Sequence, residues 1–448
     1  MTPSANPGGP VRLVELLAPL SLVTDLGMGS PDEQALRSCL VATNLARRIG
    51  LGEAEVADVY YATLLEHLGC TATSHEEAAR FGGDELATRP LMSRTDFERP
   101  RELIGMLGAL GRGTSPIARA RTTLSVVTSA KWAIDVMAGV CEVGATLARQ
   151  LHLSQSVELS LGQMFERWDG KGAPNGLRGD ATQRPARLAQ VASQAVTIAG
   201  VAGVDEALAA VRRRSGGWFD PKLSEAFVRE GPELLSEAMG TDALQAVVAA
   251  EPGPWRLVQE DRVDELAAVF GRMIDLKSTY LLGHSDGVAA LVHEAARALG
   301  LSDEDRARVR QAGFLHDLGR VGVPAGIWEK RGSLTQGEWE RVRLHAYHSE
   351  RILARSPGLS GVAGMAGMHH ERTDGSGYHR QARGGAVPQG ARVLAAADAF
   401  HAMTEPRPYR PALASDAAAD ALRGEARQGR FDARATDAVI ACAGKAGG

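Results

Sequence analysis

Apolar residues recur at three- and four-residue intervals along nearly the whole chain. Alanine and leucine are abundant, and no long run alternates valine, isoleucine, threonine or tyrosine with polar residues. This periodicity is typical of amphipathic α-helices and not of half-buried strands. We therefore expect an all-α protein.

Two helix starts carry a capping signature. Ser302 precedes Asp305 by three positions, and Thr335 precedes Glu338 by the same spacing, each before an apolar-periodic run. In such a pattern the hydroxyl accepts the backbone N–H three residues later, so we expect helices to begin at both places.

The helix predicted after Thr335 carries an inward apolar stripe. Trp339, Val342, Ala346 and Leu353 recur at helical spacing. His345 follows Val342 by three positions, so its side chain can point to the same side as the stripe.

The chain contains an internal repeat. Residues 50–69 (GLGEAEVADVYYATLLEHLG) align without gaps with residues 300–319 (GLSDEDRARVRQAGFLHDLG), and FERWDGKG at 165–172 aligns with HERTDGSG at 370–377. The offset falls from 250 to 205 residues, which places about 45 additional residues in the first copy, within 73–125. We infer a tandem duplication of a helical unit whose period is too long for a solenoid.

The repeat predicts the domain limits. We expect the first copy over residues 1–229 and the second over 263–448. Residues 230–262, which contain GPELL and EPGPW, are expected to connect the copies.

Composition excludes several classes of protein. The 448 residues are 44% hydrophobic and 23% charged, which rules out a disordered or collagen-like chain. The net charge is −4 without a strongly basic stretch, so no nucleic-acid partner is expected. The uncharged stretch 188–204 carries Gln190 and Thr197 and is interpreted as a buried helix, so no membrane partner is expected either.

The four cysteines lie far apart and form no CxxC pair. This pattern indicates a reducing compartment and no disulfide or zinc framework, so we expect a cytoplasmic protein.

Histidine is unevenly distributed. Of 12 histidines, only three precede His284, and the other nine lie between His284 and His401. A lone histidine on an apolar helix is usually a hydrogen-bonded core residue, and a lone aspartate is usually a cap, so the inference depends on the combination. In order, the ligand-type residues are His284, His316, Asp317, His345, His369, His370 and Asp398.

This set suits a pair of metal ions. The adjacent pairs His316–Asp317 and His369–His370 can each offer side chains to two neighbouring metals, and an aspartate can bridge them through its two oxygens. Nitrogen and oxygen donors without thiolate favour Fe or Mn over structural zinc. Two such ions about 3.5–4 Å apart generate a hydroxide nucleophile and bind phosphate oxygens.

The second copy resembles an HD-GYP domain of the HD phosphohydrolase superfamily from about Leu276 to Arg410. The phrases GHS, HDLGR, HHER, DGSGY, ADAF and RPYR occur in the family's order. The resemblance implies a metal-dependent phosphodiesterase, typically acting on cyclic di-GMP, in which a hydroxide activated at a binuclear centre attacks phosphorus. The seven residues named above would be the metal ligands, with Asp317 bridging.

The resemblance also implies residues that contact the substrate. Asp317 and Arg320 would be catalytic. The residues expected to bind substrate are Arg320, Asp374, Gly375, Gly377, Tyr378, Arg407 and Arg410. For the last two arginines, the alternative is a pair of structural salt bridges.

The sequence departs from the family at three positions. Arg320 stands where the family has lysine, and the two cations differ because arginine is a planar fork and lysine a point charge. His379 replaces the proline of GYP, so substrate choice is more open than hydrolysis. Tyr280 stands where some members place a third-metal glutamate, which favours a binuclear centre.

Two further histidines have open roles. His379 is a candidate proton donor to the leaving oxygen, and the alternative is an exposed loop residue. His401 follows Asp398 by three positions and is either a contact behind the ligands or a polar residue at the edge of the core.

The first copy has lost the ligand types. In the alignment Glu66 and His67 replace His316 and Asp317, while Met164, Phe165 and Ser193 replace His369, His370 and Asp398, and His345 falls near Gly139. Methionine, phenylalanine and serine do not hold a divalent metal pair, so we expect no metal here. A degenerate copy is expected to serve as a regulatory pocket or as a surface for a protein partner.

Three functions remain open from the sequence. The first is a phosphodiesterase with two Fe or Mn ions acting on a nucleotide substrate, with cyclic di-GMP as the best single substrate. The second is an HD phosphohydrolase acting on another nucleotide or phosphoester. The third is a module that binds a nucleotide without turnover and signals to a partner protein, although a binding module needs no complete ligand set.

Overall fold

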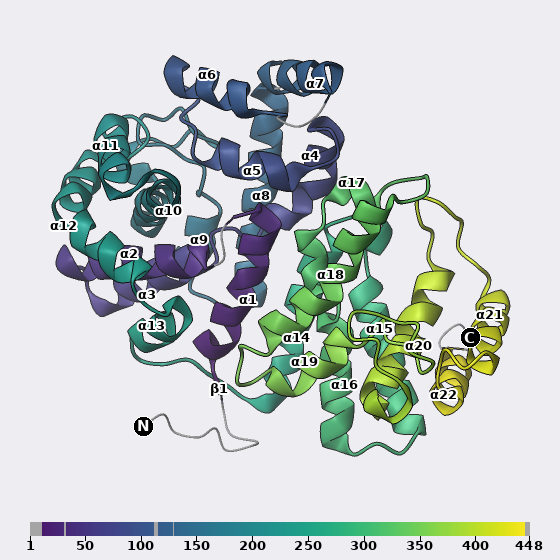
Figure 1. The fold of residues 1–448 in the computed structure, drawn as a ribbon. Helices are drawn as coiled ribbons and strands as arrows, with labels where there is room; N and C mark the ends of the chain where they lie inside the picture. Colours follow the sequence, from purple (N-terminus) through teal and green to yellow (C-terminus); the bar gives the residue numbers. More distant parts are fainter. Residues whose placement is uncertain (1–10, 31–32, 112–114, 129, 444–448) are drawn as a thin grey trace. The chain divides into compact units, whose positions relative to one another are not determined.

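The periodic apolar positions form α-helices throughout the described chain, which comprises residues 11–30, 33–111, 115–128 and 130–443 of a computed structural model (Figure 1). Within these residues the strands are β1 (Val11–Arg12) and β2 (Leu257–Val258), which pair antiparallel. The expected all-α fold is confirmed.

Contacts divide the chain into two units. The first unit runs from Thr24 to Arg256, and the second combines the residues up to Val23 with those from Leu257 onward. These limits differ from the expected ones. The segment expected to connect the copies falls mostly in the first unit, because Tyr60 donates a hydrogen bond to the Val247 carbonyl at 2.8 Å.

Helix α1 (Leu13–Met28) begins in the second unit and ends in the first. The other α-helices of the first unit are α2 (Gln34–Arg48), α3 (Glu53–Leu64), α4 (Ser74–Arg80), α5 (Glu85–Ser93), α6 (Pro100–Ala109), α7 (Pro116–Val127), α8 (Ala130–Gln150), α9 (Gln155–Leu161), α10 (Arg184–Ala202), α11 (Val204–Arg214), α12 (Pro221–Met239) and α13 (Ala243–Ala250). Those of the second unit are α14 (Glu260–Asp275), α15 (His284–Ala298), α16 (Asp303–Leu315), α17 (Ala325–Trp328), α18 (Gln336–Leu353), α19 (Ser360–Gly367), α20 (Gln389–Thr404), α21 (Ser415–Arg427) and α22 (Ala433–Ala443).

The helices repeat in the order that the sequence alignment predicts. Helices α2 and α3 begin 250 positions before α15 and α16, and α9 and α10 begin 205 positions before α19 and α20. The additional residues of the first copy form α5, α6 and α7, which have no counterpart between α17 and α18. The two units are therefore copies of one helical arrangement.

Both predicted caps are present. The Ser302 hydroxyl accepts the Asp305 N–H at 3.1 Å. Thr335 and Glu338 form a complete capping box at the start of α18. Each side chain satisfies an N–H group that the first helical turn leaves without an intrahelical partner.

The predicted stripe of α18 is correct except at its start. Val342, Ala346 and Leu353 are buried, and His345 is 1% exposed, but Trp339 is 45% exposed. Trp339 lies in the first turn of α18, at the edge of the stripe, where its ring remains at the surface.

One loop is built in the same way in both units. The Glu371 carboxylate accepts the N–H groups of Arg380 and Ala382 at 2.6 and 2.9 Å. Its counterpart Glu166, 205 positions earlier, accepts two loop N–H groups at 2.7 and 2.8 Å. A buried carboxylate therefore closes each loop by accepting two of its backbone N–H groups.

The glycines of this loop have a steric reason. A Cβ atom at Gly377 would lie 2.4 Å from the Arg372 nitrogen, and one at Gly172 would lie 2.4 Å from the Arg167 nitrogen. Gly375 has φ +82°, in the left-handed region that glycine adopts without strain. The DGxG phrase thus persists in both copies because the backbone requires it.

The stretch 188–204 belongs mostly to α10, whose apolar residues are buried up to Ile198, whereas Val201 near its end is exposed. In the part of the chain that the structure describes, no single helix has the length and hydropathy of a membrane span. The bent pair formed by Pro116–Val127 and Lys131–Gln150 meets those criteria jointly, by length and composition only.

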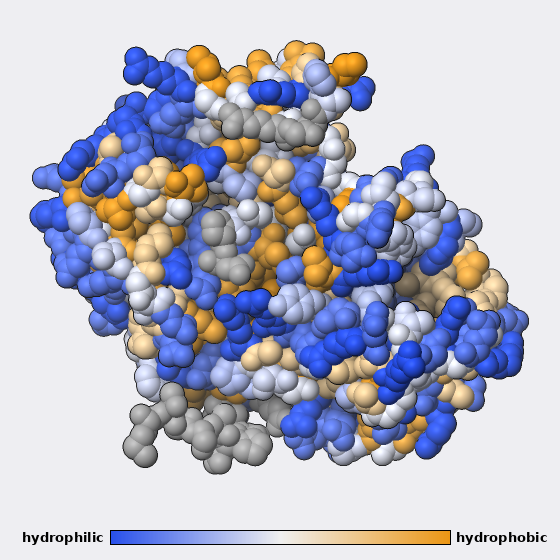
Figure 2. Space-filling model, in the orientation of Figure 1, coloured by the Kyte–Doolittle hydropathy of each residue, from blue (hydrophilic) through white to orange (hydrophobic). Residues whose placement is uncertain are grey.

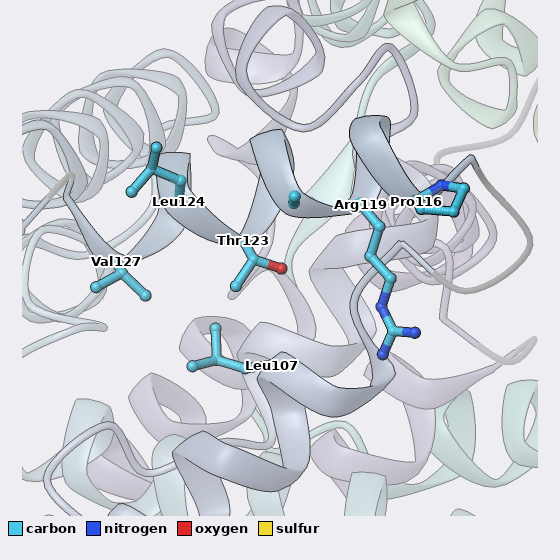
Figure 3. Close-up of a pocket in the computed structure, with 7 residues that line it drawn as sticks. Leu107, Pro116, Arg119, Thr123, Leu124 and Val127 are labelled. Atoms are coloured by element: carbon cyan, nitrogen blue, oxygen red, sulfur yellow. The ribbon is translucent and has the colours of Figure 1, made fainter.

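The additional helices of the first unit expose apolar side chains. Ile104 of α6 and Ile117 and Leu124 of α7 are 64% exposed or more, and apolar residues gather at the upper edge of Figure 2. A groove between the two helices is lined by Leu107, Pro116, Arg119, Ala120, Thr123, Leu124 and Val127 (Figure 3).

Replacement of the loop glutamate tests the shared architecture. Glu371→Ala leaves two part-buried N–H groups without their carboxylate acceptor and is expected to lower the free energy of unfolding by about 2 kcal/mol. Glu166→Ala is expected to cost a similar amount. The control Glu340→Ala loses only an ion pair at the surface and should change the free energy of unfolding by less than about 0.5 kcal/mol. Urea unfolding measures all three, and a loss at Glu371 no larger than at Glu340 would contradict the assigned role.

Candidate metal centre

Five segments of the second unit converge on one buried cluster. His284 is the first residue of α15, and His345 lies in the middle of α18. His316 and Asp317 follow the end of α16, and the adjacent His369 and His370 follow α19. Asp398 lies in α20, so all seven predicted ligand-type residues come together in this unit.

Asp317 lies at the centre of the cluster and faces two groups of imidazoles. Its Oδ2 is 3.1 Å from His316 Nε2 and 3.7 Å from His284 Nε2. Its Oδ1 is 3.4 Å from His345 Nε2 and 3.6 Å from His369 Nε2. The carboxylate therefore separates the histidines into two sets, one at each oxygen.

Each set has a further member. Asp398 Oδ1 lies 3.3 Å from His284 Nε2 and 3.8 Å from His316 Nε2. On the other side, ligand atoms of His345, His369 and His370 all lie within 4.8 Å of one another. Groups of three ligand atoms at this spacing are close enough to hold a metal ion on either side of Asp317.

Hydrogen bonds fix which ring nitrogen faces the cluster. Nδ1 of His316, His345 and His369 donates to the backbone carbonyl three residues earlier, at 2.8, 2.5 and 2.5 Å. His284 Nδ1 donates to Glu405 Oε2 at 2.8 Å. A neutral imidazole that donates through Nδ1 presents a lone pair at Nε2, which is the form that ligates a metal.

The atoms at the centre lack partners of their own. Nε2 of His284 and His316 and both carboxylate oxygens of Asp317 are buried without a hydrogen bond, and Asp317 Oδ2 is compensated by the ion pair with Arg320 Nε at 2.6 Å. His345 Nε2 and His369 Nε2 lie 3.1 Å apart, although both rings already hold their proton at Nδ1. Two lone pairs at this distance repel unless a cation lies between them, so the donor set fits divalent metal ions.

The charges of the cluster suit cations. Burial by itself would raise the pKa of Asp317, but the Arg320 guanidinium and His316 hold it well below its usual value. Burial lowers the pKa of His345 to about 3, and it lowers the pKa of His370 well below the ordinary value. An ionised carboxylate therefore stands beside the neutral imidazoles of His345 and His370, which is the protonation state that metal binding requires.

His284 is the exception in the metal-free protein. Burial opposes its charged form, but the adjacent carboxylates of Asp398 and Glu405 raise its pKa to about 9. His284 would hold a metal ion as the neutral imidazole, with the proton kept at Nδ1 and Nε2 free to ligate.

The predicted substrate arginines differ in their surroundings. Arg320 is buried with Nε 2.6 Å from Asp317 Oδ2, so it reaches the cluster. Arg407 donates to the Tyr280 carbonyl and to Glu405 Oε2, at 2.5 and 2.8 Å. Arg410 donates to backbone carbonyls at the end of α20, among them Met403 at 3.1 Å, and to the Glu405 carbonyl at 3.2 Å, and thereby ties its loop to the helix.

The predicted residues of the glycine loop divide into two kinds. Tyr378 is close to the cluster, with its ring 4.7 Å from that of His370. Asp374 is exposed and accepts the Ser376 N–H at 2.8 Å, which stabilises the turn. His379 Nε2 lies 3.4 Å from the Glu350 carboxylate, and its ring packs edge-on against that of Tyr347.

Sequence reasoning missed Glu405. Its carboxylate accepts a hydrogen bond from His284 and another from Arg407, and its Oε1 lies 3.3 Å from His401 Nδ1. The available signal was its position seven residues after Asp398, immediately after the end of α20 and two residues before RPYR.

The same place in the first unit is filled differently. Val140 and Phe165, the counterparts of His345 and His370, pack with Cys70 and Met28 in an apolar cluster. Glu66 accepts a hydrogen bond from Ser193 at 2.8 Å, in the positions of His316 and Asp398. Apolar packing thus occupies what is a cluster of nitrogen and oxygen donors in the second unit.

Comparisons with known proteins agree with this geometry. A family model described as HD domain matches residues 268–435. The chain is 32% identical to the 3'3'-cGAMP-specific phosphodiesterase 3 of Vibrio cholerae, over 91% of this chain and 89% of that protein. It is 36% identical to the cyclic di-GMP phosphodiesterase response regulator RpfG of Xanthomonas campestris, over 40% of this chain and 48% of that protein.

A solved structure matches nearly the whole chain. The crystal structure of a cyclic GMP-AMP-specific phosphodiesterase of V. cholerae superposes with a TM-score of 0.66 at 29% identity, covering 97% of this chain and 98% of that one. Fold and site together define a metal-dependent phosphohydrolase of the HD type. Within that class, the chain belongs to the HD-GYP phosphodiesterases.

Metal content tests the cluster. His369→Ala removes an imidazole from one side of Asp317 and is expected to lower the number of metal ions bound per chain by about one. Met164→Ala, at the same position of the first unit, should leave the metal content unchanged. Elemental analysis after reconstitution with Mn measures both, and an equal metal content in the two variants would contradict the arrangement.

The pH dependence of stability tests the environment of Glu66, whose side chain is buried in the first unit at the position of His316. Burial raises the pKa of Glu66 from its ordinary 4.5 to about 8, although the Ser193 bond opposes the shift. Between those values the folded protein holds a proton that the unfolded chain has released, so stability falls as pH rises. Burial lowers the pKa of the neighbouring His67 to about 4, which makes stability rise with pH between about 4 and 6.5. Above pH 6.5 His67 is neutral in both states and no longer opposes the effect of Glu66.

We therefore expect Glu66 to reduce the free energy of unfolding by about 2 kcal/mol between pH 6.5 and 8. Glu66→Gln keeps an oxygen to accept from Ser193 and should remove this part of the pH dependence. Urea unfolding of both proteins at the two pH values measures the difference. Parallel pH profiles would show that Glu66 is ionised throughout.

Proposed function

We propose that this protein hydrolyses a phosphodiester bond of a cyclic dinucleotide, with 3'3'-cGAMP as the first substrate to test. The observation that supports this choice is the extent of similarity. The match to the cGAMP-specific enzyme extends over 91% of this chain and so includes both units, whereas the match to the cyclic di-GMP enzyme RpfG extends over 40%. Cyclic di-GMP, the substrate expected from the motifs, is the second candidate.

The proposal includes two divalent ions, Fe or Mn, held on opposite sides of Asp317. One would be bound by His284, His316 and Asp398 with Oδ2, and the other by His345, His369 and His370 with Oδ1. When bound, such a pair lowers the pKa of water and neutralises phosphate charge. The protein's part is to present the seven side chains in fixed tautomers within a buried site.

Arg320 and Arg407 are proposed to meet the phosphates. The Arg320 guanidinium lies at Asp317 and also stacks on Trp328, with Cζ 4.8 Å from the ring centroid, so its orientation is held. Arg407 lies at Glu405, behind His284. A fixed planar cation next to the metals suits a phosphodiester oxygen, since it can donate two parallel hydrogen bonds.

The first unit is proposed to bind no metal and to act through contacts. Its apolar cluster around Val140 and Phe165 supports the first part. The helices α6 and α7, which the second unit lacks, expose Ile117 and Leu124 and support a surface for a protein partner.

One assay tests the proposed substrate. The purified full chain, loaded with Mn or Fe, is incubated with 3'3'-cGAMP, cyclic di-GMP, cyclic di-AMP and their linear products. We expect cleavage of 3'3'-cGAMP with the highest kcat/KM, and its loss by at least about 100-fold in Asp317→Ala, because the central carboxylate is removed.

Exposed Asp286→Asn, at the start of α15, is the matched control and should retain activity. A higher kcat/KM for cyclic di-GMP than for 3'3'-cGAMP would make cyclic di-GMP the preferred substrate. Absence of cleavage of every phosphodiester above the Asp317→Ala level would overturn the proposed function.

A further inference from the structure

The histidines of the centre do not all obtain their orientation in the same way. Nδ1 of His316, His345 and His369 donates to a carbonyl three residues earlier in the chain, so the local helix holds each ring. His284 is the first residue of α15 and follows Gly283, whose φ is +83°. The short 3-10 turn Thr279–Leu281 ends before Leu282 and Gly283, so no continuous helix leads into His284, and its Nδ1 finds its acceptor in another part of the chain.

We propose that Glu405 is a positioning residue that fixes His284 for metal binding. Its Oε2 accepts the Nδ1 proton of His284 at 2.8 Å, across 121 positions of sequence. This contact sets both the ring plane and the tautomer of His284, so that Nε2 faces Asp317 and Asp398. The inference rests on the proposed metal pair and adds a residue that no ligand motif contains.

The carboxylate of Glu405 is itself held from two sides. Arg407 donates to Oε2 at 2.8 Å, and His401 Nδ1 lies 3.3 Å from Oε1. The side chain is 16% exposed and directly follows α20, the helix that carries Asp398. One segment thus supplies a ligand to the centre and the acceptor that orients a second ligand on α15.

Gly287 provides the space for this arrangement. A Cβ atom at position 287 would lie 1.8 Å from His401 Nε2. The His401 ring also stacks edge-on against His284, with centroids 5.4 Å apart. Any side chain at 287 must therefore displace His401 from Glu405 and loosen the support of His284.

A separate ion is the competing interpretation of these three residues. Ligand atoms of His284, His401 and Glu405 lie within 4.8 Å of one another, so they could in principle hold a cation. The Arg407 guanidinium already occupies Glu405 Oε2 and repels a second positive charge there. The geometry therefore favours a hydrogen-bonded support over an additional metal site.

The experiment measures metal binding without substrate. Wild type, Glu405→Gln, Glu405→Ala and Gly287→Ala are stripped of metal and titrated with Mn against a chelator of known affinity, and the number of ions bound at saturation is counted. We expect affinity to fall about 10-fold in Glu405→Gln and Gly287→Ala and up to about 100-fold in Glu405→Ala. The number of ions at saturation should be unchanged, and Asp286→Asn should bind as wild type.

Kinetics separate positioning from general damage. At limiting Mn, kcat should fall in the Glu405 variants, and saturating Mn should restore most of it while KM for the dinucleotide stays within about twofold. Glu405→Gln keeps the shape of the side chain, so it serves as the test if Glu405→Ala does not fold. Wild-type Mn affinity in Glu405→Gln and Glu405→Ala would overturn the proposal, and so would the loss of one ion with the remaining affinity unchanged. Mn affinity is measured without substrate. If the wild-type protein binds Mn but cleaves no phosphodiester, the proposed function is wrong, and the role of Glu405 is still decided by the affinities.

Discussion

The buried carboxylate of Asp317 is the constraint on which the second unit depends. It is 2% exposed, and burying a charge of this kind is costly unless partners compensate it. Arg320 provides one partner, and the imidazoles around both oxygens provide ligands for cations that supply the rest. Five helices must therefore meet at one point, namely α15, α16, α18, α19 and α20. Their caps and loop contacts hold the helix ends near that point.

The duplication separates residues that maintain the fold from residues that carry chemistry. Glu371 and Gly377 have counterparts with the same role in the first unit, because a closed loop and a close backbone approach are needed in both. His345 and His370 have apolar counterparts, because an apolar cluster fills the same volume without metal. The motif positions that are the same in both units therefore mainly maintain the fold, and those that differ carry the metal ligands.

Residue types predicted the ligands of the metal centre, but they did not predict Glu405, which orients His284. The order of histidines and aspartates predicted a cluster, and the structure brings all seven together. Glu405 escaped notice because a glutamate at a helix end is usually a solvated charge, and its partner His284 lies 121 positions away. Arg410 was expected at the substrate, and the structure adds that its guanidinium binds carbonyls at the end of α20, which composition does not reveal.

The amino-acid sequence by itself determined the helical class, the duplication and the loss of ligand types in the first copy. These follow from periodicity and side-chain chemistry, which are properties of neighbouring residues or of direct alignment. Only the tertiary structure decided that the oxygens of Asp317 face different sets of imidazoles and that Glu405 orients His284. It also decided that the residues up to Val23 join the second unit. Those outcomes depend on distances between segments far apart in the chain, which the packing of helices sets and no local pattern encodes.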